Sequence, residues 1–326
     1  MGVRVMRGKV GLMVLAVLLV LSCAISAYAK FPERPVTIVV PFGVGGGADT
    51  FARALQGPLS RALGVPVVIV NVEGGGGLKG MIYAAQQPAD GYTLFLFTTS
   101  HLIASILKRA DVDLFKDFEI LARLQHDISV LWVSSDSKFK TFKELIDWAK
   151  KNPYALTVAG TSPLGFDEFR DRYFAKQFDI KITFVPFESS SQAKTAVLGG
   201  FVISHMEEPL AIKGIIDSGK GRVLVVMWKE RLPLWPDVPC VKEFGVEDYV
   251  GVFRAIAVKK GTPPEAIEVL SKAIEKAVQD PEYIEFNKRT MGDLRPGYLP
   301  GPQFLEELKK ERVAYEEIAK ELGYIK

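Results

Sequence analysis

The sequence predicts an α/β protein built as two domains of related plan. Short apolar runs alternate with amphipathic segments of helical period, which is the pattern of strands and helices in an α/β fold. The order strand, loop, helix, strand occurs twice along the chain, and 326 residues are near the limit of one compact core. Hydrophobic residues make up 48% and charged residues 24%, which excludes a disordered or collagen-like chain.

The first half contains three expected strands with helices between them. Val36–Val40 is an almost continuous apolar run, typical of a strand that is buried on both faces of a parallel sheet. The elements expected after it are a helix over Asp49–Leu63, a strand at Val67–Val70, a helix around Leu78–Gln87 and a strand at Tyr92–Phe97. This order favours a parallel sheet with right-handed crossovers.

The second half repeats the pattern, and the chain ends in helices. The expected elements are strands at Ser129–Val133, Leu156–Ala159, Ile182–Pro186 and Val223–Met227, with helices over Phe142–Lys150 and Phe166–Gln177. Towards the C-terminus, Thr262–Glu265 has the pattern of a capping box with proline in the first turn. Asp280 and Pro281 start a short helix, and a final amphipathic helix ends at Gly323.

The N-terminus has the three parts of a secretory signal. Three basic residues lie among the first nine, an apolar run covers Val10–Leu21, and small residues flank Tyr28. About 12 apolar residues are too few for a spanning helix. We expect residues 1–29 to be a signal peptide cleaved near Ala29, with a lipoprotein anchor at Cys23 as the alternative. The leader carries the whole net charge of +3, so the neutral mature chain is not expected to bind nucleic acid.

A glycine-rich loop between the first strand and the first helix is the strongest candidate for a binding site. Glycines before a helix start let backbone N–H groups approach an anion. Gly43, Gly45 and Ala48, with Glu73 downstream, also match a dinucleotide fingerprint, although a secreted protein meets little of that cofactor. A tight turn without function is the third interpretation. The candidate residues here are Phe42, Gly43, Gly45, Gly46 and Asp49.

Hydroxyl-bearing residues follow one strand in each half. Thr98, Thr99 and Ser100 come after the third strand, at the edge where open α/β sheets bind ligands. The loop Gly160–Gly165 stands in the same relation to a strand of the second half and contributes Thr161, Ser162 and Gly165. Hydroxyls at helix starts are commonly plain caps. We interpret the two segments as polar loops that face each other across a cleft.

Signatures of an enzyme or a metal site are absent from the sequence. The three histidines lack metal-ligand spacing, two cysteines cannot form a cysteine-rich site, and no nucleophile or nucleotide motif is complete. We therefore expect no catalytic residue, metal or cofactor.

Glu207 and Glu208 are either a solvated helix start before Pro209 or carboxylates that accept an ammonium group. Arg254 is either a snorkelling strand residue or an anion clamp.

With these residues in place, the chain resembles the substrate-binding proteins of tripartite tricarboxylate transporters, the Bug-type extracytoplasmic receptors. The resemblance covers the mature chain and rests on several segments in the right order. These are Phe31–Val36, Val40–Asp49, Ala89–Leu94, Val185–Phe187, Leu198–Gly200, Leu234–Pro239 and Lys260–Pro264. Val44, Phe97, the segment Gly160–Phe166 and the pair Glu207-Glu208 depart from the family pattern.

The resemblance implies a two-domain Venus-flytrap architecture with the ligand enclosed between the domains. It implies a first domain of residues 30–127 plus 253–326 and a second of residues 128–252. It places Phe187 and Arg254 among pocket or hinge residues. Its implied ligand is a small di- or tricarboxylate, passed to a large and a small multi-spanning transporter subunit. We expect a periplasmic monomer.

The leading hypothesis is a binding protein that captures a small organic acid by domain closure. We expect backbone N–H groups and hydroxyls, with at most one arginine, to hold the carboxylate. A secreted α/β enzyme that binds a nucleotide cofactor at Gly43–Gly47 is one alternative. A ligand receptor that feeds a signalling partner is the other.

Overall fold

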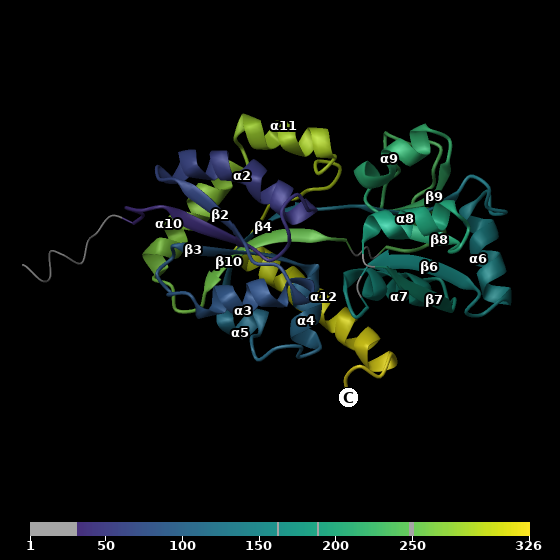
Figure 1. Cartoon of the computed structure of the whole chain (residues 1–326), viewed down its shortest axis with the longest axis horizontal. Coiled ribbons are helices and arrows are strands. Elements are labelled where there is room, and N and C mark those ends of the chain that lie inside the picture. The colour runs from purple at the N-terminus through teal and green to yellow at the C-terminus, as the bar shows by residue number, and fades with distance from the viewer. Residues whose placement is uncertain (1–30, 162, 188, 248–250) are drawn as a thin grey trace, which may run out of the picture.

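The computed structural model describes residues 31–161, 163–187, 189–247 and 251–326. Two β-sheets lie side by side along the long axis, and each is covered by helices (Figure 1). This arrangement confirms the predicted α/β fold of two similarly built halves. The signal segment, its cleavage site and Cys23 lie outside the described residues, as does Ser162.

The first sheet has six strands in the order β11-β4-β10-β3-β1-β2. Three of them, β1, β2 and β3, run parallel, whereas β10 lies antiparallel between β3 and β4. Their bounds are β1 Val36–Val40, β2 Val67–Asn71, β3 Thr93–Thr98, β4 Phe118–His126, β10 Phe253–Lys259 and β11 Leu299–Pro300. Because β10 comes from late in the chain, the C-terminal segment completes the sheet that the N-terminal segment begins.

Helices cover both faces of the first sheet and bury two apolar cores. Successive residues of β1 point to opposite faces. Ile38 therefore packs under α2, α10 and α11, while Val39 packs under α3, α4 and α12. The helices are α2 Gly47–Leu63, α3 Leu78–Gln86, α4 Thr99–Ile106, α5 Leu114–Asp117, α10 Pro264–Ala277, α11 Pro281–Thr290 and α12 Gly301–Glu321.

The second sheet has five strands in the order β7-β6-β8-β5-β9. Strand β6 runs parallel to β7 and β8, and β5 runs antiparallel to β8 and β9. The strands are β5 Ser129–Ser134, β6 Leu156–Thr161, β7 Ile182–Phe187, β8 Ser204–Glu207 and β9 Gly221–Met227. Its helices are α6 Phe142–Lys151, α7 Phe166–Gln177, α8 Ser190–Leu198 and α9 Pro209–Asp217. Residues 127 and 128 lead into this sheet from β4, and the chain returns at β10.

Three local expectations differ from the structure. The expected capping box at Thr262 does not form, because α10 begins after Pro263 and the Thr262 hydroxyl donates to the Lys259 carbonyl. Strands β4, β8 and β11 were not predicted. In β4, Arg123 interrupts the apolar pattern, and its guanidinium donates to the Gly297 carbonyl. The hydroxyl segment after β3 is the start of α4 and not a loop. None of the helices in the described part of the chain is long and apolar enough to span a bilayer.

Candidate functional site

Two pockets lie between the two sheets, and both contact the predicted glycine loop. The first, the α4–α7 pocket, has a volume of about 200 Å³. The second, the α2–α9 pocket, has about 260 Å³. The α4–α7 pocket is lined by Phe42, Gly76, Thr98, Thr99, Ser100, Arg109, Thr161, Gly165, Phe166, Asp167 and Val252. The α2–α9 pocket is lined by Gly45, Gly47, Thr50, Phe51, Gln125, Asp127, Glu208, Leu210, Ala211, Arg254, Phe286 and Thr290.

The start of α4 is held in place by a buried histidine. The backbone N–H of Thr98 donates to His101 Nδ1 at 3.0 Å, so that the ring carries its proton on Nε2, which lies 3.3 Å from the Gly77 carbonyl. Burial lowers the pKa of His101 to about 4, which keeps the ring neutral at pH 7. His101 is therefore part of the scaffold that positions the helix start.

Two of the three hydroxyls predicted at this edge, those of Thr99 and Ser100, have different roles. Thr99 Oγ1 donates to the Gly251 carbonyl and accepts the Phe253 N–H, both at 3.2 Å. This hydroxyl ties α4 to the segment that returns from the second sheet. Ser100 is half-buried on the pocket wall. Because the first N–H groups of a helix have no partner within the helix, the start of α4 offers donors to the pocket.

The start of α7 faces the same pocket from the other half. The backbone N–H and the hydroxyl of Thr161 both donate to Asp167 Oδ2 at 2.7 Å. Arg170, 2% exposed, lies 3.3 Å from Asp167 Oδ1 and 3.0 Å from Asp171 Oδ1. Burial raises the pKa of Asp171 to about 7 although Arg170 opposes the shift. The Thr161 donors are thus used within the protein, whereas the N–H groups of the first turn of α7, before Phe169, face the pocket end of the helix.

One cation at the α4–α7 pocket was absent from the sequence-based prediction. Arg109 lies in the turn after α4, is exposed, and lines the pocket. Nothing in its local sequence indicates a site, because the turn brings it back to the helix start only in three dimensions. The sequence-based prediction also lacked Asp127, which leads into the second sheet and lines the α2–α9 pocket.

Asp49 organises the glycine loop from within. Its carboxylate is 1% exposed and accepts the Gly45 N–H at 2.8 Å, Arg53 at 2.9 and 3.0 Å, and Asn71 at 2.9 Å. The hydrogen bond from Arg53 is the main cause that lowers the Asp49 pKa to about 2. Asp49 therefore lies behind the pocket wall and shapes the loop that forms it.

The other candidate residues of the glycine loop, Phe42, Gly43, Gly45 and Gly46, have different surroundings. Gly43 approaches Glu73 so closely that a Cβ would lie 2.5 Å from its carboxylate. Gly46 has a φ of −73°, which any residue adopts, and is the N-cap of α2. Phe42 lines the α4–α7 pocket, and Gly45 lines the α2–α9 pocket.

The buried charges of the α2–α9 pocket come from both halves. Arg254, whose side chain is 13% exposed, forms an ion pair with Asp127 and donates to Gln125 Oε1 at 3.2 Å. Glu208 is the N-cap of α9. Burial, followed by the charge of Glu207, raises the pKa of Glu208 to about 8. Arg254 is thus paired inside the protein, on the wall of a pocket.

Glu207 and Glu208 lie at a helix start before Pro209, as one of the two interpretations held, but neither is solvated as it expected. Glu207 ends β8, is 8% exposed, and accepts hydrogen bonds from the Ser190 hydroxyl and the Glu208 N–H. Glu208 is half-buried on the pocket wall. The sequence could not show this, because Ser190 of α8 and the residues that line the α2–α9 pocket with Glu208 are distant in the chain.

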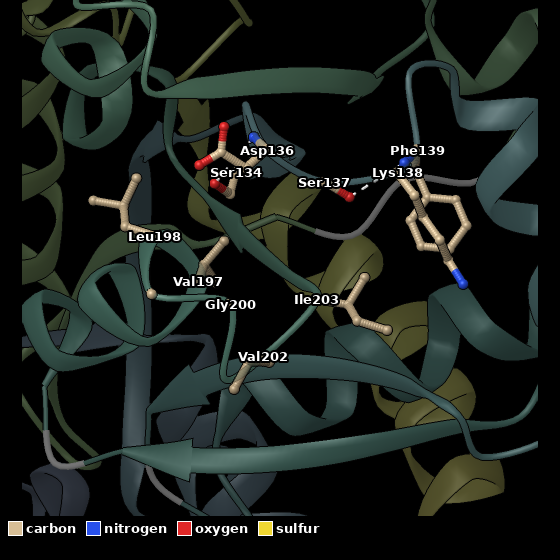
Figure 2. Close-up of a pocket in the computed structure, with 11 residues that line it drawn as sticks. Ser134, Asp136, Ser137, Lys138, Phe139, Val197, Leu198, Gly200, Val202 and Ile203 are labelled. Atoms are coloured by element: carbon tan, nitrogen blue, oxygen red, sulfur yellow. Dashed lines mark hydrogen bonds between the residues drawn. The ribbon is translucent and has the colours of Figure 1, made fainter.

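Two hollows of the second half lie apart from these pockets. Phe187 lines a shallow apolar hollow with Ala196 and Phe201, which is 85% exposed. A larger pocket of about 460 Å³ lies where the loop after β5 meets the end of α8 (Figure 2). Val197, Val202 and Ile203 contribute apolar side chains to its lining, and Asp136 and Lys138 contribute exposed charged ones (Figure 2). The described residues contain no cluster of potential metal ligands.

Comparison with known proteins gives one family match and several similar chains. The model of the tripartite tricarboxylate transporter family receptor matches residues 51–323. Protein BugT of Bordetella pertussis is 30% identical over 263 residues, which cover 78% of this chain and 79% of that protein. MatC from Rhodopseudomonas palustris with bound malate has a TM-score of 0.72 at 25% identity, covering 88% of this chain and 99% of that one. The structure of an R. palustris protein with adipate has a TM-score of 0.74 at 25% identity, and the match covers 90% of this chain and 99% of that one.

Proposed function

The chain belongs to the tripartite tricarboxylate transporter receptor family, and we propose that it captures a small di- or tricarboxylate in the α4–α7 pocket for a membrane transporter. As a member of this family it is a solute-binding receptor and not an enzyme. The proposal includes a periplasmic location, a large and a small multi-spanning transporter subunit as partners, and a monomeric receptor. It also includes domains of residues 30–127 plus 253–326 and residues 128–252.

One observation carries this proposal: two helix starts from different halves line the same pocket. The N-termini of α4 and α7 each present backbone N–H groups and a partial positive charge. Arg109 adds a full positive charge at the rim. Hydrogen bonds from such donors to a carboxylate are charge-assisted and therefore stronger than neutral ones. The arrangement fits an anion with two acidic ends.

The size of the pocket limits the ligand. The volume of about 200 Å³ lies below the ~300–1,000 Å³ of typical small-molecule sites, which favours a dicarboxylate with a short carbon chain. The malate and adipate bound by the two R. palustris proteins are ligands of this class and support the proposal.

The pocket lies between the two halves of the protein, so closing the halves would capture the ligand. A ligand that contacts α4 in one half and α7 in the other binds the closed arrangement better than an open one. The Thr99 hydroxyl links α4 to the segment that returns from the second sheet. Closing the halves therefore moves one helix start relative to the other while α4 keeps its place on the hinge.

The test is a panel of mono-, di- and tricarboxylates and their methyl esters in a thermal-shift assay. Ligand at a hundred times its dissociation constant stabilises the protein by about 2.7 kcal/mol. At least one free acid should raise the melting temperature, and its ester should not. Arg109→Gln should weaken the shift, whereas Lys108→Gln should not, because Lys108 is exposed but does not line the pocket. A panel without any stabilising acid contradicts the function. Equal effects of the two variants contradict the pocket.

A further inference from the structure

The α4–α7 pocket has an acidic side chain on its wall, although its proposed ligand is an acid. Of the residues that line it, Arg109 and Asp167 are the charged ones. Asp167 lies in the first turn of α7. Its carboxylate would repel a ligand carboxylate, because like charges disfavour each other most where water is partly excluded. A dicarboxylate therefore binds here only if a cation offsets the charge of Asp167.

Arg170 supplies this cation from behind the pocket wall. Among the described residues, it is the basic side chain that forms an ion pair with Asp167, with Nη2 at 3.3 Å from Oδ1. The other oxygen of Asp167 accepts the backbone N–H and the hydroxyl of Thr161, both at 2.7 Å. Arg170 lies one turn further along α7, is buried and does not line the pocket. It acts on the wall without reaching the ligand.

Three further contacts hold the guanidinium of Arg170 in this place. Nε donates to Asp171 Oδ1 at 3.0 Å, and Nη2 donates to the Met206 carbonyl at 3.1 Å. Its Cζ lies 5.2 Å from the ring centroid of Phe166, within the range of a cation–π contact. Phe166 and Asp167 both line the pocket. Arg170 thus joins α7 to the end of β8 and contacts two residues of the pocket wall.

The other titratable groups around this ion pair do not replace Arg170. Burial lowers the pKa of His205 to about 3, so its ring is neutral at pH 7. Burial raises the pKa of Asp171 to about 7 although Arg170 opposes the shift, so this carboxyl is only partly ionised at neutral pH. Glu207 is a further acid that acts on Arg170. The surroundings are therefore acidic or neutral, and Asp167 depends on Arg170 for its counter-charge.

We infer that Arg170 is a positioning residue for ligand binding, which neutralises Asp167 from behind the wall of the α4–α7 pocket and fixes the first turn of α7 for a dicarboxylate. This inference rests on the proposed function, because it concerns the same pocket. Without Arg170, Asp167 would face the ligand as an unpaired charge. The loss of binding would then come from that charge, and removing the charge would restore binding. A residue that only supports the fold gives no such recovery.

The experiment measures the binding of succinate, malate, adipate and citrate by isothermal titration calorimetry at pH 7. Arg170→Met keeps an apolar stem but removes the charge, and should weaken the best-bound acid by on the order of tenfold or more. Asp167→Asn should bind the same acid more tightly than the wild type. The double variant should recover most of the affinity that Arg170→Met loses. Arg172→Met is the matched control and should bind as the wild type does, since Arg172 lies on the same helix but pairs with Glu168 and does not line the pocket.

The outcomes separate this inference from the proposed function. Circular dichroism melts first establish which variants are folded. If Arg170→Met binds as tightly as the wild type, or if the double variant binds no better than Arg170→Met, the inference is wrong while the receptor function stands. If Arg170→Met does not fold, Asp167→Asn decides, and binding no tighter than that of the wild type contradicts the inference. If none of the four acids binds the wild type, the proposed function fails and the inference fails with it.

Discussion

Replacing Asp49 by asparagine tests whether one buried carboxylate organises the glycine loop. Asp49 accepts hydrogen bonds from the Gly45 N–H, from Arg53 and from Asn71, and its side chain is almost completely buried. Asparagine has nearly the same volume but no charge, and its amide N–H₂ would face donors. The variant should therefore lose stability without leaving a cavity.

The expected loss follows from the pKa of Asp49. The folded protein lowers this pKa from 3.8 to about 2. Such a difference contributes about 2 kcal/mol of stability at neutral pH, since each unit corresponds to 1.36 kcal/mol. A group with a depressed folded pKa contributes this stability above its unfolded pKa and loses it as the pH falls through the folded value. The melting temperature should fall by roughly 4–8 °C at pH 7, at about 2–4 °C per kcal/mol.

The measurement is urea denaturation of wild type and Asp49→Asn at pH 7 and at pH 3. The difference in unfolding free energy should shrink to about half at pH 3. At that pH, Asp49 of the wild type is mostly protonated in the unfolded chain but still mostly ionised in the folded protein. Asp111→Asn is the control, because Asp111 is exposed in the same half and should change stability by less than about 0.5 kcal/mol. Equal stability of the Asn variant and wild type at pH 7 would refute the reasoning, as would a difference that does not depend on pH.

Three further predictions concern other parts of the chain. Without ligand, the contribution of Glu208 to the stability of the wild type should fall from pH 4.5 to pH 8, because its folded pKa is raised to about 8. Glu208→Gln lacks this contribution, so the stability of the variant relative to the wild type should grow with pH in a series of melts. Thr99→Val removes the bonds to Gly251 and Phe253 and should cost about 1–3 kcal/mol in urea denaturation, whereas unchanged stability would exclude the hinge role. Intact-mass analysis of the exported protein should show a start near Lys30, and a lipid on Cys23 would contradict it.

The sequence by itself determined the local elements and the class of the fold. The bounds predicted for α7, Phe166–Gln177, coincide with those of the structure, because its ends and its period are local properties. The strand before the glycine loop was equally clear, since Val36–Val40 is apolar except for Thr37. Glycines that lead from a strand into a helix also indicated a loop that walls a pocket, as Gly45 and Gly47 do.

Only the tertiary structure decided how these elements come together. Strand β10 lies between β3 and β4, and no pattern within Phe253–Lys259 encodes partners more than a hundred residues away. The division of the candidate residues between two pockets follows from that pairing, which sets Arg254 beside Thr98. The state of Glu208 depends on it as well. Whether a carboxylate is solvated or buried is a property of the groups packed around it, and those groups come from both halves of the chain.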